Sequence, residues 1–179
     1  EAEDGTRLTA RAVVASPNIQ LTLRLLPDGA IPQSTRRLLS RARIGNGIGM
    51  MVRYAMRELP GYSALPGSGG PGPQHNGLQL ICPDLPYLQR AYADYLAGRP
   101  AQEPALIAMT FSATDPTLAP PGHHLLYLWG QYYPYELPSG ESWDDVGPRE
   151  ADRMLATLAR YAPNVTRAVV GQLVETPLY

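Results

Sequence analysis

The stretch HHLLYLWGQYYPY, residues 123–135, alternates side chains in the way that is typical of a β-strand exposed differently on its two sides. One side is mostly apolar and suits packing under helices: His124, Leu126, Leu128 and Gly130. The other side carries large rings and one amide: Leu125, Tyr127, Trp129 and Gln131. Such a face suits the wall of a pocket for a bulky apolar ligand. Packing of the same rings in a core or an interface is the alternative.

The rest of the chain surrounds this strand with further strands and helices. Apolar and alternating patterns predict strands at residues 5–15, 47–59, 78–82 and 104–114, and at the end of the stretch 163–177. Helices are expected after Pro32, after a cap at Asp84 and over 147–162. The pattern predicts an α+β fold: a mixed, mainly antiparallel sheet with about three helices packed on one face.

Composition excludes several classes of function. The 179 residues have a net charge of −1, which gives no electrostatic footprint for nucleic acid. The lone Cys82 excludes an internal disulfide and a multi-cysteine metal site, and its apolar neighbours favour a buried structural thiol. No apolar run reaches the roughly 20 residues that span a bilayer. No secretory signal pattern precedes the domain, and both ends look cut, so we expect part of a longer protein.

Motifs for common chemistries are weak or absent. The stretch GNGIGMM, residues 45–51, lacks the third glycine of a dinucleotide-binding turn and leads into a strand-like pattern, which favours a strand bulge. His123 and His124 point to opposite faces and are poorly placed to bind one metal ion, so no metal site is predicted. His75 lies in a Gly/Pro loop, where we expect it to be solvated. No GxSxG motif is present, and the sequon at Asn164 has little weight without a secretory signal.

Taken in order, several blocks of the chain resemble one family. They are DGTRLTARAVVASPN, LLPDGAIP, RELPGYSALPG, ICPDLPYLQRAYADYLAGRPAQEPAL, DPTLAPPGHHLLYLWGQYYPYEL and LARYAPNVTRAVVGQLVETPLY. They are similar to the central region of the phytoene dehydrogenase-like FAD-dependent oxidoreductases, within the amine oxidase and carotenoid desaturase superfamily. The resemblance implies a strand bordering the FAD domain over 1–18, a substrate-binding domain over 19–172, and a return to the FAD domain over 173–179. The Rossmann-type FAD domain itself would be missing.

The resemblance also implies a function. The whole protein would oxidise or desaturate an apolar small molecule by hydride transfer to FAD, while the present chain alone would hold no FAD and be inactive. It implies no catalytic residue here. The residues expected to line the substrate are Tyr127, Trp129, Gln131 and Tyr133, followed by Met51 and Arg53. VVASPN departs from the family's usual Asn-Ala corner, which leaves border contacts of Ser16 and Asn18 with the cofactor undecided.

Partners and location follow from the same resemblance. The expected partners are the apolar substrate and the FAD domain of the same chain, with homo-oligomer and peripheral membrane contacts left open and nucleic acid excluded. The expected location is the cytoplasm, with membrane association left open. Two other functions remain: a stand-alone α+β module that binds a hydrophobic ligand or mediates oligomerisation, and an interaction domain within a multienzyme assembly.

Overall fold

The computed structural model describes residues 2–42, 45, 47, 49–67, 69–138 and 140–178. The chain forms two compact units, unit 1 (Glu1–Ile44) and unit 2 (Gly45–Tyr179), and each is described by itself. Residues 19–42, expected within the substrate-binding domain, therefore belong to unit 1. The expected boundaries after residues 18 and 172 refer to an FAD domain and stay a prediction.

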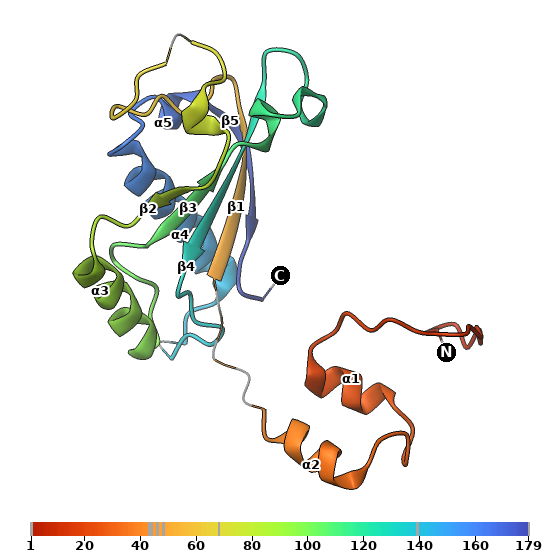
Figure 1. Cartoon of the computed structure of the whole chain (residues 1–179). Helices are drawn as coiled ribbons and strands as arrows, with labels where there is room; N and C mark the ends of the chain where they lie inside the picture. The colour runs from red at the N-terminus through yellow and green to blue at the C-terminus, as the bar shows by residue number, and fades with distance from the viewer. Residues whose placement is uncertain are drawn as a thin grey trace. The chain divides into compact units, whose positions relative to one another are not determined.

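Unit 2 is built on one five-stranded antiparallel sheet (Figure 1), which confirms the predicted α+β class. Its strands, in the spatial order β2-β3-β4-β1-β5, come from widely separated parts of the chain. They are β1 (Gly49–Met56), β2 (Gln79–Ile81), β3 (Leu106–Met109), β4 (His124–Gln131) and β5 (Val169–Glu175). The long, strongly patterned strands β1 and β4 form the centre, and the short β2 and the exposed β5 form the edges.

One face of this sheet forms the hydrophobic core with helix α4 (Trp143–Ala159), which lies behind the sheet in Figure 1. The strand residues of the core face alternate as predicted and are almost wholly buried: Met50, Val52, Tyr54 and Met56 of β1, Leu126 and Leu128 of β4, Leu106 and Ala108 of β3. The Tyr54 hydroxyl donates a hydrogen bond of 2.9 Å to the Ala151 carbonyl and ties β1 to α4. Burial raises the pKa of this phenol.

Helix α4 begins four residues earlier than the predicted Gly147. Ser142 caps it, with its Oγ accepting from the Asp144 N–H at 3.1 Å, and Asp144 and Asp145 place negative charge in the first turn. Pro148 is accommodated inside the helix. The capping serine was therefore a stronger start signal than the proline.

Two further helices complete unit 2. In α3 (Leu85–Leu96) the predicted cap is present, because Asp84 Oδ1 accepts from the Tyr87 N–H at 2.7 Å. The Tyr87 hydroxyl donates to the Pro104 carbonyl at 3.0 Å, and burial raises the pKa of this phenol to about 12. The four-residue α5 (Val165–Ala168) leads directly into β5, as the sequence predicts.

Three 3₁₀ turns occupy the loops: η1 (Pro73–His75), η2 (Phe111–Ala113) and η3 (Pro116–Leu118). The first two explain why β3 ends at Met109 and not at the predicted Thr114. Thr110 bonds to the His75 carbonyl at 3.1 Å, and the Ser112 hydroxyl accepts from the Leu125 N–H at 2.9 Å. These contacts turn the chain away from the sheet.

Unit 1 contains two short helices, α1 (Ile19–Leu25) and α2 (Gln33–Ser40). Helix α2 starts directly after Pro32, as predicted. Side chains join the two helices: Gln20 Nε2 donates to the Ala42 carbonyl at 2.9 Å, and Arg36 Nη1 donates to the Leu23 carbonyl at 3.0 Å. Leu23 is the one buried residue among those described in this unit.

The strand predicted over residues 5–15 is not formed. The segment has no regular secondary structure, and Val13 and Val14 are 87% and 95% exposed. An isolated strand leaves its backbone N–H and C=O groups without partners, so alternation alone cannot produce one. The described part of the chain provides no neighbouring strand for this segment.

Candidate functional site

The sheet face opposite α4 combines apolar side chains, aromatic rings and one ion pair, and we call it the open face. Strand register places its members on one side: Leu80 opposite Ile107, Ile107 and Met51 opposite Trp129, Met109 and Arg53 opposite Tyr127. Together the open face comprises Leu80, Ile107, Met109, Leu125, Tyr127, Trp129, Gln131, Met51, Arg53, Ala55, Leu173 and Glu175. Most of these residues are half-buried, and Leu80 and Leu173 are 65% and 46% exposed. The open face therefore presents apolar side chains and rings at the surface of unit 2.

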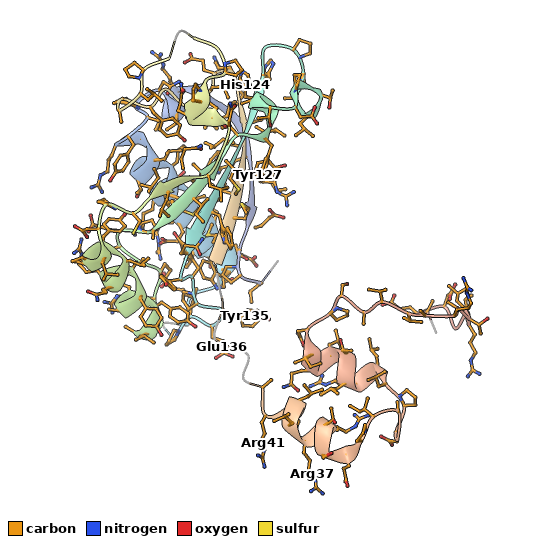
Figure 2. All side chains as sticks on the ribbon, viewed as in Figure 1. Arg37, Arg41, His124, Tyr127, Tyr135 and Glu136 are labelled. Atoms are coloured by element: carbon orange, nitrogen blue, oxygen red, sulfur yellow. The ribbon has the colours of Figure 1, made fainter. Side chains whose placement is uncertain are left out.

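Tyr127 lies at the middle of this face. Figure 2 shows it between His124, at one end of β4, and Tyr135 and Glu136 beyond the other end. The Phe111 ring meets the Tyr127 ring edge-on, with centroids 5.2 Å apart, and the Arg53 guanidinium lies 5.5 Å from the centroid of the same ring. The phenol is thus held between an aromatic edge and a cation, both of which favour a fixed ring orientation.

Trp129 depends on a glycine of the neighbouring strand, Gly49, which pairs with Gln131. A Cβ atom on Gly49 would stand 2.5 Å from Trp129 Nε1, so only glycine lets the indole lean over β1. Next to this indole, Gln131 has a buried Nε2 that meets no hydrogen-bond partner among the residues that the structure describes. At the end of the open face near Gly49, the Trp129 ring therefore lies beside the Gln131 amide, whose Nε2 can still donate hydrogen bonds.

Arg53 and Glu175 form an ion pair on the open face. Arg53 Nε and Nη2 each lie 2.9 Å from a different carboxylate oxygen of Glu175, a bidentate arrangement between β1 and β5. The Arg53 side chain is 45% exposed and that of Glu175 is 13% exposed. Bidentate pairs of this kind fix the guanidinium in one plane.

Tyr133 does not join the open face, contrary to the prediction. Tyr132 adopts φ 64°, a left-handed conformation that breaks the alternation after Gln131. The Tyr133 ring then turns to the core side, where it is fully buried, lies over Gly130 and comes within 6.2 Å of the Trp143 ring. Its hydroxyl has no hydrogen-bond partner in the described part of the chain, and burial raises the pKa of this phenol.

The three histidines occupy different surroundings. The expectation that His75 is solvated is wrong: it is 4% exposed, its Nδ1 accepts from the Gly72 N–H at 3.0 Å, and its Nε2 lies 2.9 Å from the Pro60 carbonyl. His123 is exposed. His124 Nδ1 is buried and has no partner among the described side chains and backbone, and desolvation lowers the pKa of this imidazole. Within the described residues, no three His, Cys, Asp or Glu side chains are grouped closely enough to hold a metal ion.

The weaker sequence motifs have structural roles or lie partly outside the described residues. Residues 46 and 48 of the glycine-rich stretch are outside them. Gly47 has φ 99° and closely approaches the backbone at Tyr133–Tyr135, and Gly49 is the first residue of β1. The amide of Asn164 accepts from the Gly61 N–H at 2.7 Å and donates to Glu58 and to the Leu59 carbonyl, so it anchors a loop.

Three other residues singled out in the sequence are described within their own units. Ser16 is exposed, and Asn18 caps α1, with its Oδ1 accepting from the Leu21 N–H at 3.0 Å. Both belong to unit 1. Cys82 is half-buried, where a buried thiol was expected.

Of the six residues expected to line the substrate, five share the open face: Tyr127, Trp129, Gln131, Met51 and Arg53. Sequence reasoning missed the contributions of Ile107, Phe111, Leu173 and Glu175 to this surface. Alternation could have grouped Ile107 and Leu173 by face within their own strands. The Glu175 contact with Arg53 needs the β1–β5 register, which no local pattern contains.

Comparison with known proteins relates the chain to oxidoreductases. It is 31% identical, over 98% of its length, to pyridine nucleotide-disulfide oxidoreductase domain-containing protein 2 of Mus musculus and of Rattus norvegicus. A shorter match, 37% identical over 83 residues, is to a phytoene dehydrogenase of Streptomyces griseus. The chain spans 31% of the length of the two rodent proteins and matches 16% of the bacterial one. No family model matches the chain.

Among the residues that the structure describes, none of the helices combines the length and the apolar character that crossing a bilayer requires.

Proposed function

We propose that unit 2 is the substrate-binding domain of an FAD-dependent oxidoreductase of the phytoene dehydrogenase-like type, and that its open face lines the substrate cavity. In the whole protein, an apolar substrate would be oxidised or desaturated by hydride transfer to FAD. The observation that carries the proposal is the open face itself, a half-exposed row of rings, methionines and leucines on a sheet whose other face is fully packed. The similarity to an oxidoreductase-domain protein over 98% of the chain supports the reaction class.

The topology of unit 2 supports the same proposal. Met51 near the start of β1 pairs with Glu175 at the end of β5, so both connections of unit 2 leave from one end of the sheet (Figure 1). Trp129 and Gln131 belong to the same end, because they pair with Met51 and Gly49. The proposal places the flavin at this end of the open face, where its indole and amide lie.

This chain's own residues would bind and orient the substrate and keep water away. Flavin supplies the redox chemistry as hydride acceptor in such enzymes. Phosphate binding at a helix N-terminus has no counterpart in the described part of the glycine-rich stretch 45–51, because Gly49 opens a strand there. We therefore propose that residues outside this chain bind the phosphates of FAD. The proposed role of the open face does not depend on those contacts.

Tryptophan fluorescence tests whether the open face binds an apolar ligand. Trp129 lies on this face, while Trp143, the second tryptophan, is 3% exposed in the core and gives a constant background. Titration of the chain with farnesene, an acyclic terpene hydrocarbon, should change the emission of Trp129 in a saturable way. The Tyr127→Ala variant should weaken binding several-fold, because a ring of this size buries a large apolar area.

Tyr92→Ala is the matched control, since Tyr92 is an exposed tyrosine of α3 outside the open face. It should bind farnesene as the unaltered chain does. Absence of a saturable response in the unaltered chain would overturn the cavity assignment. The cofactor assignment is checked separately: the whole protein should purify with the visible absorption of bound flavin, and residues 1–179 alone should not retain added FAD.

A further inference from the structure

A charged group in the middle of an apolar surface requires an explanation. Arg53 stands on β1 between Tyr127 and Leu173, and Met51 and Ala55 precede and follow it on the same face. Placing a guanidinium there costs desolvation free energy when a ligand covers it, unless every N–H group finds an acceptor. A surface for a pure hydrocarbon is better served by an aliphatic residue.

The hydrogen bonds of Arg53 are only partly used. A guanidinium has five N–H donors, and Glu175 accepts from Nε and from Nη2. Among the residues that the structure describes, none accepts a hydrogen bond from Nη1 of Arg53. The side chain is 45% exposed, so these remaining donors are accessible from the open face.

The charge of Arg53 is already balanced. Glu175 neutralises it at 2.9 Å, and a second carboxylate on Nη1 would be repelled by the first. A neutral oxygen atom accepts the hydrogen bond without that repulsion. The centroid of the Tyr127 ring lies 5.5 Å from the guanidinium carbon. The ring thus packs against the guanidinium group and leaves Nη1 accessible to a ligand.

We propose that Arg53 is a specificity-determining residue that donates a hydrogen bond from Nη1 to a neutral carbonyl oxygen of an otherwise apolar substrate. The inference rests on the proposed function, because it takes the open face as the substrate-binding surface. The substrate class is thus an apolar molecule with one carbonyl group, and a hydrocarbon without oxygen leaves donors of Arg53 unsatisfied. A site that leaves a polar group unsatisfied when the wrong ligand binds discriminates between two ligands more strongly than a site that differs only in shape.

The test compares two ligands of the same shape. Geranylacetone, an unconjugated ketone, and the hydrocarbon in which a methylene replaces its carbonyl are titrated against the chain with Trp129 emission as readout. We expect the ketone to bind roughly tenfold more tightly, as for a hydrogen bond from a charged donor. Arg53→Met should remove the preference by weakening the ketone and leaving the hydrocarbon nearly unchanged.

Arg90→Met is the matched control. Arg90 repeats the arrangement on α3: it lies 5.7 Å from the Tyr87 ring centroid and 3.4 Å from a Glu103 oxygen, away from the open face. This variant should keep the tenfold preference. Equal binding of the two ligands by the unaltered chain, or an unchanged preference in Arg53→Met, overturns the role of Arg53. Binding of neither ligand instead overturns the proposed function.

A second variant tests the charge argument and does not depend on the folding of Arg53→Met. Glu175→Gln keeps the side-chain shape but leaves the Arg53 charge uncompensated. The carboxylic acid of the same carbon skeleton should bind the unaltered chain more weakly than the ketone does, and Glu175→Gln should reverse this order. A carboxylate that binds both forms of the protein equally contradicts the proposed selection for a neutral oxygen.

Discussion

Burial gives the histidines of unit 2 different chemical properties, although two of them are adjacent in sequence. His123 is exposed, whereas His124 pairs with Met56 on the core side of β4 and has a buried Nδ1. Desolvation is the main cause that lowers the pKa of His124 below the ordinary 6.5, and the nearby His75 and His123 lower it further. Protonation of His124 is therefore harder in the folded than in the unfolded chain.

This pKa difference predicts a loss of stability in mild acid. Between the lowered pKa of folded His124 and the unfolded value of 6.5, the unfolded chain binds more protons, so the free energy of unfolding falls as the pH falls through that window. Urea unfolding followed at pH values from about 7.5 to about 5 measures the slope. His124→Gln should make the slope shallower.

His123→Gln is the control for this measurement, because it removes a neighbouring imidazole that is exposed. It should retain most of the slope of the unaltered chain. If His124→Gln loses stability in acid as steeply as the unaltered chain, another group is responsible and the assignment to His124 is wrong.

The two residues after Gln131 end strand β4 abruptly. Tyr132 takes a left-handed conformation, Tyr133 enters the core, and its ring occupies the space over Gly130 that a side chain would need. Met154 of α4 lies against the same point. The end of β4 therefore requires a glycine for packing and not for its backbone angles.

Gly130→Ala tests this packing. The added methyl group would collide with the Tyr133 ring and with Met154, and overpacking of this kind typically costs about 1–3 kcal/mol of unfolding free energy. Gly171→Ala on β5 provides the comparison, because a Cβ there meets no atom within 4 Å. Urea midpoints should fall for the first variant and stay nearly constant for the second. Equal midpoints would show that Tyr133 yields easily.

Elements with a strong local pattern could be predicted, and elements decided by distant partners could not. The alternation in β1 and β4, the Asp84 cap of α3 and the stripe of α4 are all local, and all were predicted. Residues 5–15 alternate equally well but form no strand in the described chain, because a strand exists only with a neighbour. In α1, Ile19, Leu21, Leu23 and Leu25 alternate like a strand, and the Asn18 cap was the overlooked helix signal.

The candidate site, too, could be predicted only where the signal is local. Five of the six expected residues share the open face because alternation within one strand assigns them to a side. Tyr133 fails because a single left-handed residue intervenes, and tyrosine gives no warning of that conformation. The Arg53–Glu175 contact joins residues 122 positions apart and could come only from the fold.

At the scale of the whole molecule, the two units differ in how much they bury. The described residues of unit 1 include one buried side chain, Leu23, whereas unit 2 has a continuous core between its sheet and α4. Opening of α1 and α2 thus exposes little new apolar surface and costs little free energy.

Hydrogen exchange followed by mass spectrometry should reveal this difference. Amides of α1 and α2 should exchange orders of magnitude faster than those of β1 and β4, which pair on both sides in the centre of the sheet. The peptides of edge strand β5 should exchange at intermediate rates. Protection of residues 19–40 equal to that of β1 would contradict this expectation and would mean that further contacts stabilise unit 1.

The pairing of Met51 with Glu175 also has a mechanical consequence. Because β1 enters and β5 leaves unit 2 at the same end of an antiparallel ladder, a pulling force applied through these two connections acts across the strands and not along them. The ladder would open one residue pair at a time, starting at Met51 and Glu175, while β3 and β4 carry no load. Unit 2 should consequently peel apart from its β5 edge under low force instead of resisting as a sheared sheet does.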